Sequence, residues 1–376
     1  MNDIVLTYSP ISRRFAMSKN HLPRPLSLPF FAAFTLLEIV IVTAIIAGLV
    51  TLITAAAITV KSSVTHSTLV SKMSQIESAL ERYKNEFGEY PPDMTRDAEL
   101  IRHVKMRWPR YDFPIDPDPL RPARFLRQAI AFAYLGAGYG NVDFGPNDLM
   151  IGISPSNLAL WLGGIPDQDG KCAGFGVDPM APFGRDHVTK RINCGVVGGS
   201  DGVVPPNVRL DKQDRKVFLD LEVDKDVVFH RFYKDGSGRI PYFVVQSEGR
   251  TVPLIYFRAQ KGEPSKAYHK FSGASGHHPS ASGFEMHGEE DWRPLAFSVA
   301  YAKKGNGIMA QNVEWFEPNR YQLILPGKDG KFGNDNPALA QRKFRVVGDS
   351  FTGMCQEDWD NLTNFSGYKP LKTLLP

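Results

Sequence analysis

An uninterrupted apolar segment near the N-terminus constrains this chain more than any other feature. Between Glu38 and Lys61 no charged residue occurs over about 22 positions. A helix needs roughly 20 apolar residues to cross the hydrocarbon core of a membrane. Residues 34–60 therefore predict one membrane-spanning helix. Glu38, at its start, is the exception, because a carboxylate close to the hydrocarbon is costly unless it is paired.

The charges on either side of this segment indicate its orientation. Four basic residues precede it, namely Arg13, Arg14, Lys19 and Arg24, whereas Lys61 alone follows closely. Because basic residues favour the cytoplasmic side of a membrane, we expect the N-terminal residues in the cytoplasm and everything after Val60 outside. An ordinary cleaved secretory signal fits less well, since its apolar region spans only about 7–15 residues. A plain signal anchor is the alternative.

The residues at the start of the segment resemble a known processing motif. Ala33 is followed by Phe34, and Glu38 is the fifth residue counted from Phe34. This arrangement resembles the prepilin cleavage and methylation motif of type IV pilins and type II secretion pseudopilins. The resemblance implies cleavage between Ala33 and Phe34 by a prepilin peptidase and methylation of the new terminus. It also implies that Glu38 neutralises the N-terminal amine of a neighbouring subunit, since two charges in a low-dielectric bundle are tolerated as a pair.

The same resemblance implies a function, partners and a location. The chain would be a structural filament subunit rather than an enzyme, assembled with copies of itself and with other pseudopilins at an inner-membrane platform. It would begin as a single-pass protein in the lipid of the inner membrane, with a periplasmic domain, and then enter a periplasmic or extracellular filament. The alternative is an exported enzyme or carbohydrate-binding protein anchored by the helix. The net charge of +4 is too small to indicate nucleic acid as a partner.

A second helical pattern continues from the apolar segment. Apolar residues recur at alternating spacings of four and three, at Leu69, Met73, Ile76, Leu80, Tyr83 and Phe87. This spacing draws one stripe along a helix, which Gly88 and Pro91-Pro92 end. We therefore expect one helix from Phe34 to about Phe87, with its stripe in a domain core rather than in a coiled-coil seam. The segment from Tyr83 to Pro91 is also similar to the end of the long helix in major pseudopilins.

The rest of the chain predicts an α+β fold with long loops, in which the long helix packs on an antiparallel sheet. Short helices are expected at 125–135 and 154–162, and strands at 216–228, 242–245, 252–257 and, as the last one, 320–325. Residues 166–206 and 261–291 predict loops. The organisation is thus a leader at 1–33, a transmembrane helix at 34–60, its amphipathic continuation at 61–88 and a globular domain at 91–376. This enlarged domain, with its segment 360–365, is similar to that of prepilin-type proteins of planctomycete-like bacteria.

The chain has three cysteines, at positions 172, 194 and 355. Outside the cytoplasm, Cys172 and Cys194 can form a disulfide across a short loop, which would leave Cys355 odd.

One sequence has the form of a catalytic motif. Ser200 lies in a Gly-x-Ser-x-Gly stretch, which in hydrolases holds a nucleophile between a strand and a helix. Here Pro205 and Pro206 follow, and they exclude a helix start of the required kind. We interpret the stretch as a turn.

A loop near the C-terminus predicts a calcium site. Residues 325–335 resemble the loop of major pseudopilins in which a Tyr-x-Leu strand leads into a Gly- and Asp-rich turn. Ca²⁺ takes about six to eight oxygen ligands. The side chains of Asp329, Asn334 and Asp335 would supply some of these oxygens. The alternative is a Gly/Asp turn without metal.

Overall fold

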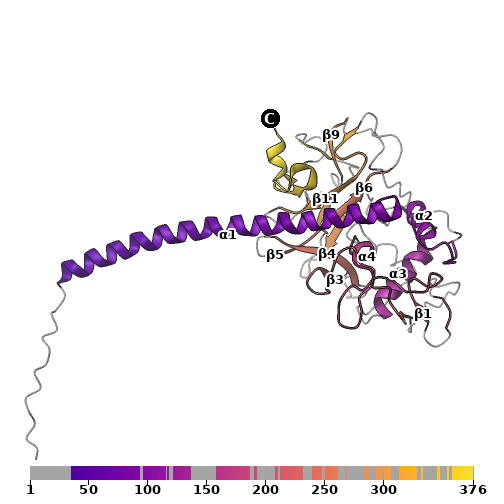
Figure 1. Ribbon diagram of the computed structural model, residues 1–376. Coiled ribbons are helices and arrows are strands. Elements are labelled where there is room, and N and C mark those ends of the chain that lie inside the picture. Colours follow the sequence, from indigo (N-terminus) through magenta and orange to yellow (C-terminus); the bar gives the residue numbers. More distant parts are fainter. Residues whose placement is uncertain are drawn as a thin grey trace, which may run out of the picture. The chain divides into compact units, whose positions relative to one another are not determined.

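The computed structural model describes residues 35–93, 96–115, 117, 122–136, 158–186, 190–192, 208–210, 212–231, 239–247, 250–260, 268, 284–287, 294–298, 300–305, 313–327, 332, 345–347, 354 and 358–375. The chain divides into two units, residues 1–59 and 60–376. The architecture is α+β, as predicted (Figure 1).

The helix predicted over residues 34–87 is present as one continuous element, α1, from Leu36 to Phe87. It ends where the sequence indicated. Gly88 has a φ of 76°, and its N–H donates to the carbonyl of Lys84 at 2.7 Å. Glycine adopts this left-handed conformation without the steric penalty of a Cβ, so it closes the helix and lets the chain turn away.

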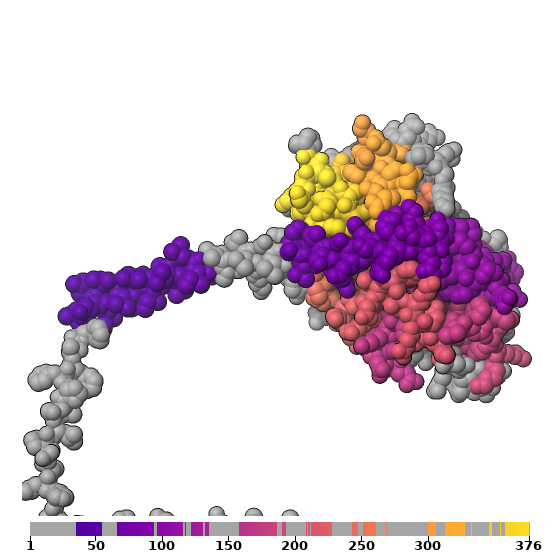
Figure 2. Space-filling view, viewed as in Figure 1, coloured from indigo at the N-terminus to yellow at the C-terminus, as the bar shows by residue number. Residues whose placement is uncertain are grey.

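The apolar stripe of α1 lies in the core of the second unit. Met73, Ile76, Leu80 and Tyr83 are fully buried, and Phe87 at the end of the stripe is half-buried. The expectation of core contact is therefore confirmed. In Figure 2 the purple surface of this part of α1 runs between the yellow and orange C-terminal segments on one side and the red to magenta segments on the other.

Among the described residues, three further α-helices belong to the second unit. The predicted helix at 125–135 is confirmed as α3, Arg124–Gly136. The one expected at 154–162 is present as α4, Leu158–Gly163, and residues 154–157 lie outside the described residues. The sequence did not reveal α2, Asp97–Arg107. Acidic residues in its first turn and basic residues in its last turn complement the helix dipole.

The strands form several small sheets, most of them antiparallel. One sheet joins β3 (Val227–Arg231), β4 (Arg239–Ser247) and β5 (Arg250–Pro253). A second has the order β13 (Leu362–Thr363), β11 (Tyr321–Leu325) and β6 (Ile255–Arg258). A third joins β10 (Glu314–Trp315), β9 (Tyr301–Lys304) and β12 (Arg345–Val346), and its β12–β9 pair is parallel. Two strand pairs complete the set, β1 (Arg185–Asp186) with β2 (Val208–Arg209) and β7 (Phe284–His287) with β8 (Pro294–Ser298).

Several strand predictions need correction. Only the end of the predicted strand 216–228 belongs to β3, because residues 216–226 form a loop bonded to α1. The apolar run 252–257 is two strands, since the chain passes at Leu254 from the β4 sheet to the β11 sheet. Within 261–291, predicted as a loop, residues 284–287 form β7. Strands β12 and β13 follow 320–325, which is therefore not the last strand.

The sheet containing β6 and β11 separates two cores. Tyr256, Leu323 and Leu325 contribute to the core that also contains α1. Ile255 and Ile324 contribute to the second core, formed with β9 and the C-terminal segments. Because successive side chains of a strand point to opposite faces, alternate residues of β6 and β11 serve the two cores.

Candidate functional site

The first half of α1 is an exposed apolar helix. Its segment Leu36–Thr54 is long and apolar enough to cross a membrane, and within the unit none of it is buried. Large apolar side chains point to every side of the helix, with Leu36, Leu52 and Ile53 at least 66% exposed. A helix that is apolar all round requires lipid or other helices around it.

The start of this segment is capped by its own side chains. The backbone N–H and the hydroxyl of Thr35 both donate to Oε2 of Glu38, at 2.8 and 2.9 Å. In return, the N–H of Glu38 donates to the Thr35 hydroxyl at 3.2 Å. This is a capping box, in which a Thr before the helix and a Glu three residues later satisfy each other's backbone N–H groups. The Thr-x-x-Glu spacing is a local signal in the sequence, and it gives Glu38 a role within its own helix beside the predicted intermolecular one.

Ala33 and Phe34, the predicted processing site, lie outside the described residues. The structure does place Glu38 in the first turn of α1, with Thr35 directly before the helix. The described part of the chain provides hydrogen bonds to Oε2 of Glu38 only. Its other carboxylate oxygen can thus accept a further donor without breaking the cap.

The second half of α1 is fastened to the domain along both flanks. On one flank the loop 216–226 runs beside the helix. Lys72 pairs with Asp226 at 2.9 Å, Arg82 donates to the carbonyl of Phe218, and Glu86 pairs with Lys216. On the other flank Glu81 accepts from Arg320 at 2.6 Å and from Tyr90 at 2.8 Å, and Glu77 accepts from Tyr368. The helix is therefore held by polar contacts on both sides in addition to its buried stripe.

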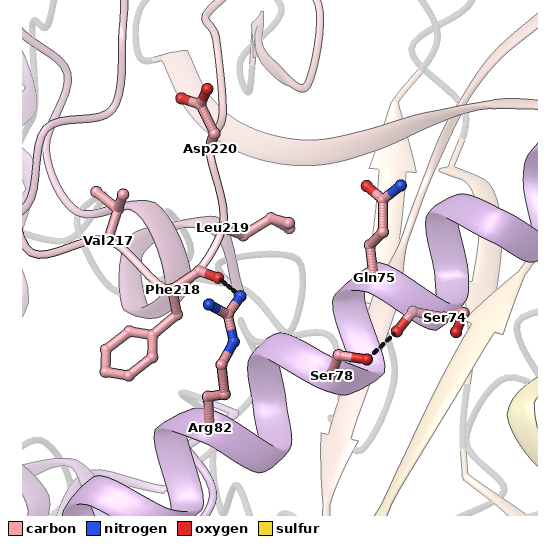
Figure 3. Close-up of a pocket in the computed structure, with 8 residues that line it drawn as sticks. All are labelled: Ser74, Gln75, Ser78, Arg82, Val217, Phe218, Leu219 and Asp220. Carbon is pink, nitrogen blue, oxygen red and sulfur yellow. Dashed lines mark hydrogen bonds between the residues drawn. The ribbon is translucent and has the colours of Figure 1, made fainter.

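A shallow groove of about 470 Å³ lies between α1 and that loop (Figure 3). Its lining consists of Ser74, Gln75, Ser78 and Arg82 from the helix and Val217, Phe218, Leu219 and Asp220 from the loop. In Figure 3 the guanidinium of Arg82 points to the backbone carbonyl of Phe218, and the hydroxyl of Ser78 points to the backbone carbonyl of Ser74. The lining contains neither His nor Cys, and two of its polar side chains are already bonded within the groove. It is best described as the seam between α1 and the loop.

A buried polar cluster lies under the C-terminal end of α1. Tyr83 of α1 contacts Nε2 of His103 through its hydroxyl at 2.6 Å, and Nδ1 of His103 lies 2.8 Å from Oε1 of Glu89. Arg102 reaches both oxygens of Glu89, at 3.0 and 2.7 Å, and Arg258 of β6 donates to Oε2 at 3.0 Å. The cluster joins α1, the turn after it, α2 and β6.

The electrostatics of this cluster follow from its burial and its two arginines. Burial raises the pKa of the Tyr83 phenol to about 12. Burial would also raise the pKa of Glu89, but hydrogen bonds from His103 and Arg102 and the charge of Arg258 outweigh it and hold that pKa well below the usual range. For His103, burial lowers the pKa and outweighs the opposite effect of Glu89. Glu89 is therefore an anion at neutral pH and His103 is neutral.

The predicted calcium ligands Asp329, Asn334 and Asp335 lie outside the described residues. Among the residues that the structure does describe, no group of three or more His, Cys, Asp or Glu could hold a metal ion. The structure does show what borders the loop. The carboxylate of Asp360 lies so close to Gly327 that a Cβ there would collide with it. Asn361 accepts from the N–H of Gly327 at 3.2 Å and donates to the carbonyl of Phe332 at 3.1 Å.

Of the two cysteines in the predicted disulfide, the structure describes Cys172. Cys172 is a buried free thiol in the structure, and burial raises its pKa to about 12. Cys194 and Ser200 both lie outside the described residues, so the Cys172–Cys194 pairing and the turn at Ser200 stay predictions.

Comparison with known proteins gives no assignment. No protein-family model, no curated protein and no solved structure matches the chain.

Proposed function

We propose that this chain is a structural subunit of a type II secretion pseudopilus or of a type IV pilus-like filament, with a pilin-like fold. One observation carries the proposal, namely the construction of α1. Its first half is apolar and fully exposed, whereas its second half is fixed in the core of a domain. A helix of this kind can sit in lipid as a precursor and among the helices of other subunits in a filament, and the domain does not need to refold between the two states.

Glu38 supports the proposal through its position and its remaining hydrogen-bonding capacity. Oε2 is bonded to Thr35, which fixes the carboxylate at the start of α1. In the filament, the amine of a neighbouring Phe34 terminus pairs with this carboxylate. A buried ion pair is tolerated when further hydrogen bonds hold its members, and Thr35 supplies them for Glu38.

The proposal includes processing, partners and location. A prepilin peptidase cleaves between Ala33 and Phe34, and copies of this chain and other pseudopilins assemble on an inner-membrane platform. Before assembly, Leu36–Thr54 spans the inner membrane with the domain in the periplasm.

A calcium site in the loop 325–335 belongs to the same proposal. Asp329, Asn334 and Asp335 would hold the ion with backbone carbonyls, and the ion would fix the loop by neutralising their charge. The chemistry of the neighbouring groups is compatible, because Asp360 brings a carboxylate and Asn361 an amide oxygen against Gly327. Lys328 and Lys331 act in the opposite direction by adding positive charge.

The mature N-terminus decides between the proposal and its alternative. The chain is produced with a prepilin peptidase and, as the control, without one, and its terminus is read by mass spectrometry. N-methyl-Phe34 in the presence of the peptidase is the expected result. An unchanged leader in both samples would support an exported enzyme or carbohydrate-binding protein with a signal anchor.

The role of Glu38 needs two variants, because it also caps α1. Glu38→Gln keeps the capping box, since Gln serves at this position as Glu does, but removes the charge. Glu38→Ala removes both. We expect both variants to insert into the membrane and both to lose incorporation into filaments, as measured by cross-linking between subunits. Normal incorporation of Glu38→Gln would show that Glu38 acts only as a cap.

A further inference from the structure

The buried cluster under the end of α1 contains a histidine whose hydrogen bonds allow only one protonation state. His103 has no exposed surface, and Tyr83, Glu89 and Arg258 are each no more than 5% exposed. Glu89 is an anion held by Arg102 and Arg258, so it can only accept hydrogen bonds. Nδ1 of His103 must therefore donate to Glu89. In the neutral ring Nε2 then accepts, and its donor is the hydroxyl of Tyr83.

We propose that Tyr83, His103 and Glu89 form an acid-sensitive latch, which fastens the C-terminal end of α1 to α2 and β6 and opens when His103 takes up a proton. The latch is independent of filament assembly. It concerns how the domain holds its long helix at different pH values.

Protonation places a second N–H of His103 against the oxygen of Tyr83. The hydroxyl hydrogen of Tyr83 must then turn away. Among the described residues, the rings of Phe87 and Phe218 pack against the ring of Tyr83, with centroids 4.6 and 5.0 Å from its own, and they offer no lone pair. Arg107 already donates to the Tyr83 oxygen at 3.3 Å. Protonation therefore reverses this hydrogen bond and leaves the hydroxyl hydrogen of Tyr83 without an acceptor among its described neighbours, which weakens the attachment of α1 to His103.

The charges facing His103 also disfavour its protonation. From its own helix α2 come Arg102 and Arg107, and from β6 comes Arg258. Among the described residues, the turn after α1 contributes the facing carboxylate, Glu89, and α1 contributes the phenol of Tyr83. From α4 the uncharged ring of Trp161 covers the imidazole, with centroids 5.0 Å apart. A cation at His103 adds a fourth positive charge around one carboxylate, in a site without access to water.

The sign of the pH effect follows from the lowered pKa of His103. The unfolded chain binds a proton at His103 with a pKa of about 6.5, and the folded chain binds it only at lower pH. Stability is therefore fully present above this value and falls as the pH drops below it. Between pH 7.5 and 5.5 the unfolding equilibrium constant should rise by up to about tenfold through this residue. Glu89 adds little in this window, because an unfolded glutamate titrates near 4.3.

The test measures urea unfolding of the full chain in detergent at pH 7.5 and 5.5, followed by tryptophan fluorescence. We expect the approximately tenfold change in the wild type and its loss in His103→Gln. The control is His66→Gln, which changes an exposed histidine of α1 and should keep the wild-type response. An equal pH response in His103→Gln and the wild type would overturn the proposal.

If His103→Gln does not fold, Tyr83→Phe replaces it and should give a smaller response than the wild type. A full response in Tyr83→Phe would likewise overturn the proposal.

A local measurement separates a latch from a general loss of stability. Hydrogen exchange of the backbone amides is followed at both pH values, after correction for the intrinsic exchange rate. At pH 5.5 the amides of residues 80–88 should lose protection before those of 69–76 do. Uniform loss along α1 would show that His103 affects global stability without releasing the helix end, and the latch would then be wrong.

Discussion

Gln322 illustrates how single buried polar side chains hold the second core together. It is fully buried on β11. Its Oε1 accepts from the N–H of Tyr301, and its Nε2 donates to the carbonyls of Tyr301 and Phe316, at 2.8, 2.8 and 3.0 Å. The side chain therefore continues the backbone hydrogen bonding of β9 and gives a buried partner to one N–H and two carbonyls.

Replacement of this side chain should be strongly destabilising. Gln322→Leu keeps the approximate volume but removes three hydrogen bonds, each of which contributes about 0.5–1.5 kcal/mol to stability. We expect a loss of about 3 kcal/mol in the free energy of unfolding, measured by chemical denaturation. Gln246→Leu is the matched control, because Gln246 is exposed on β4 and bonds only a threonine hydroxyl. Equal losses in the two variants would contradict this account of Gln322.

At the scale of elements, the sequence predicted those helices whose apolar residues recur with the helical period. The stripe from Leu69 to Tyr83 and the apolar segment before it were sufficient to predict α1, because one face of the helix meets one core. Helix α2 was missed because one of its buried positions is His103, which interrupts the apolar pattern. The alternation in 216–226 suggested a strand, whereas it reflects a loop whose side chains bond α1 at intervals.

The candidate site was predictable only in part for a related reason. The position of Glu38 was read from the sequence, and its cap could have been, since the Thr-x-x-Glu signal is local. The cluster of Tyr83, Glu89, His103 and Arg258 could not be predicted. Its members are separated by up to 175 positions along the chain, and only the packing of β6 against the end of α1 brings them together.

The proposed calcium loop gives a prediction for one segment. An ion that binds only the folded state must raise the melting temperature, by roughly 3–6 °C when calcium is about 100 times its dissociation constant. We expect this rise in the wild type on comparing calcium with a chelator, and its loss in Asp335→Ala. Asp112→Ala, which changes an exposed carboxylate after α2, should keep the rise. Identical wild-type melting curves in calcium and in chelator would show that the loop is a turn without a metal ion.

At the scale of the whole molecule, the two units differ in what covers their apolar surface. The large exposed side chains are concentrated in Leu36–Thr54, whereas the stripe of the second half of α1 is covered by its own domain. Residues 61–376 produced alone should therefore be a soluble monomer, as measured by light scattering after size-exclusion chromatography. A dimer or larger species would show that the stripe is a seam between subunits.

The contacts on both flanks of α1 also determine how the domain responds to a mechanical load. A pull along the helix axis acts on Lys72–Asp226, Glu81–Arg320 and Glu86–Lys216 in shear. The three pairs lie at successive positions along the helix. A force parallel to the helix axis therefore loads them together, whereas a force perpendicular to it would break them one after another. Tension applied to the first half of α1 would thus move the domain as a single body, and the domain would stay folded.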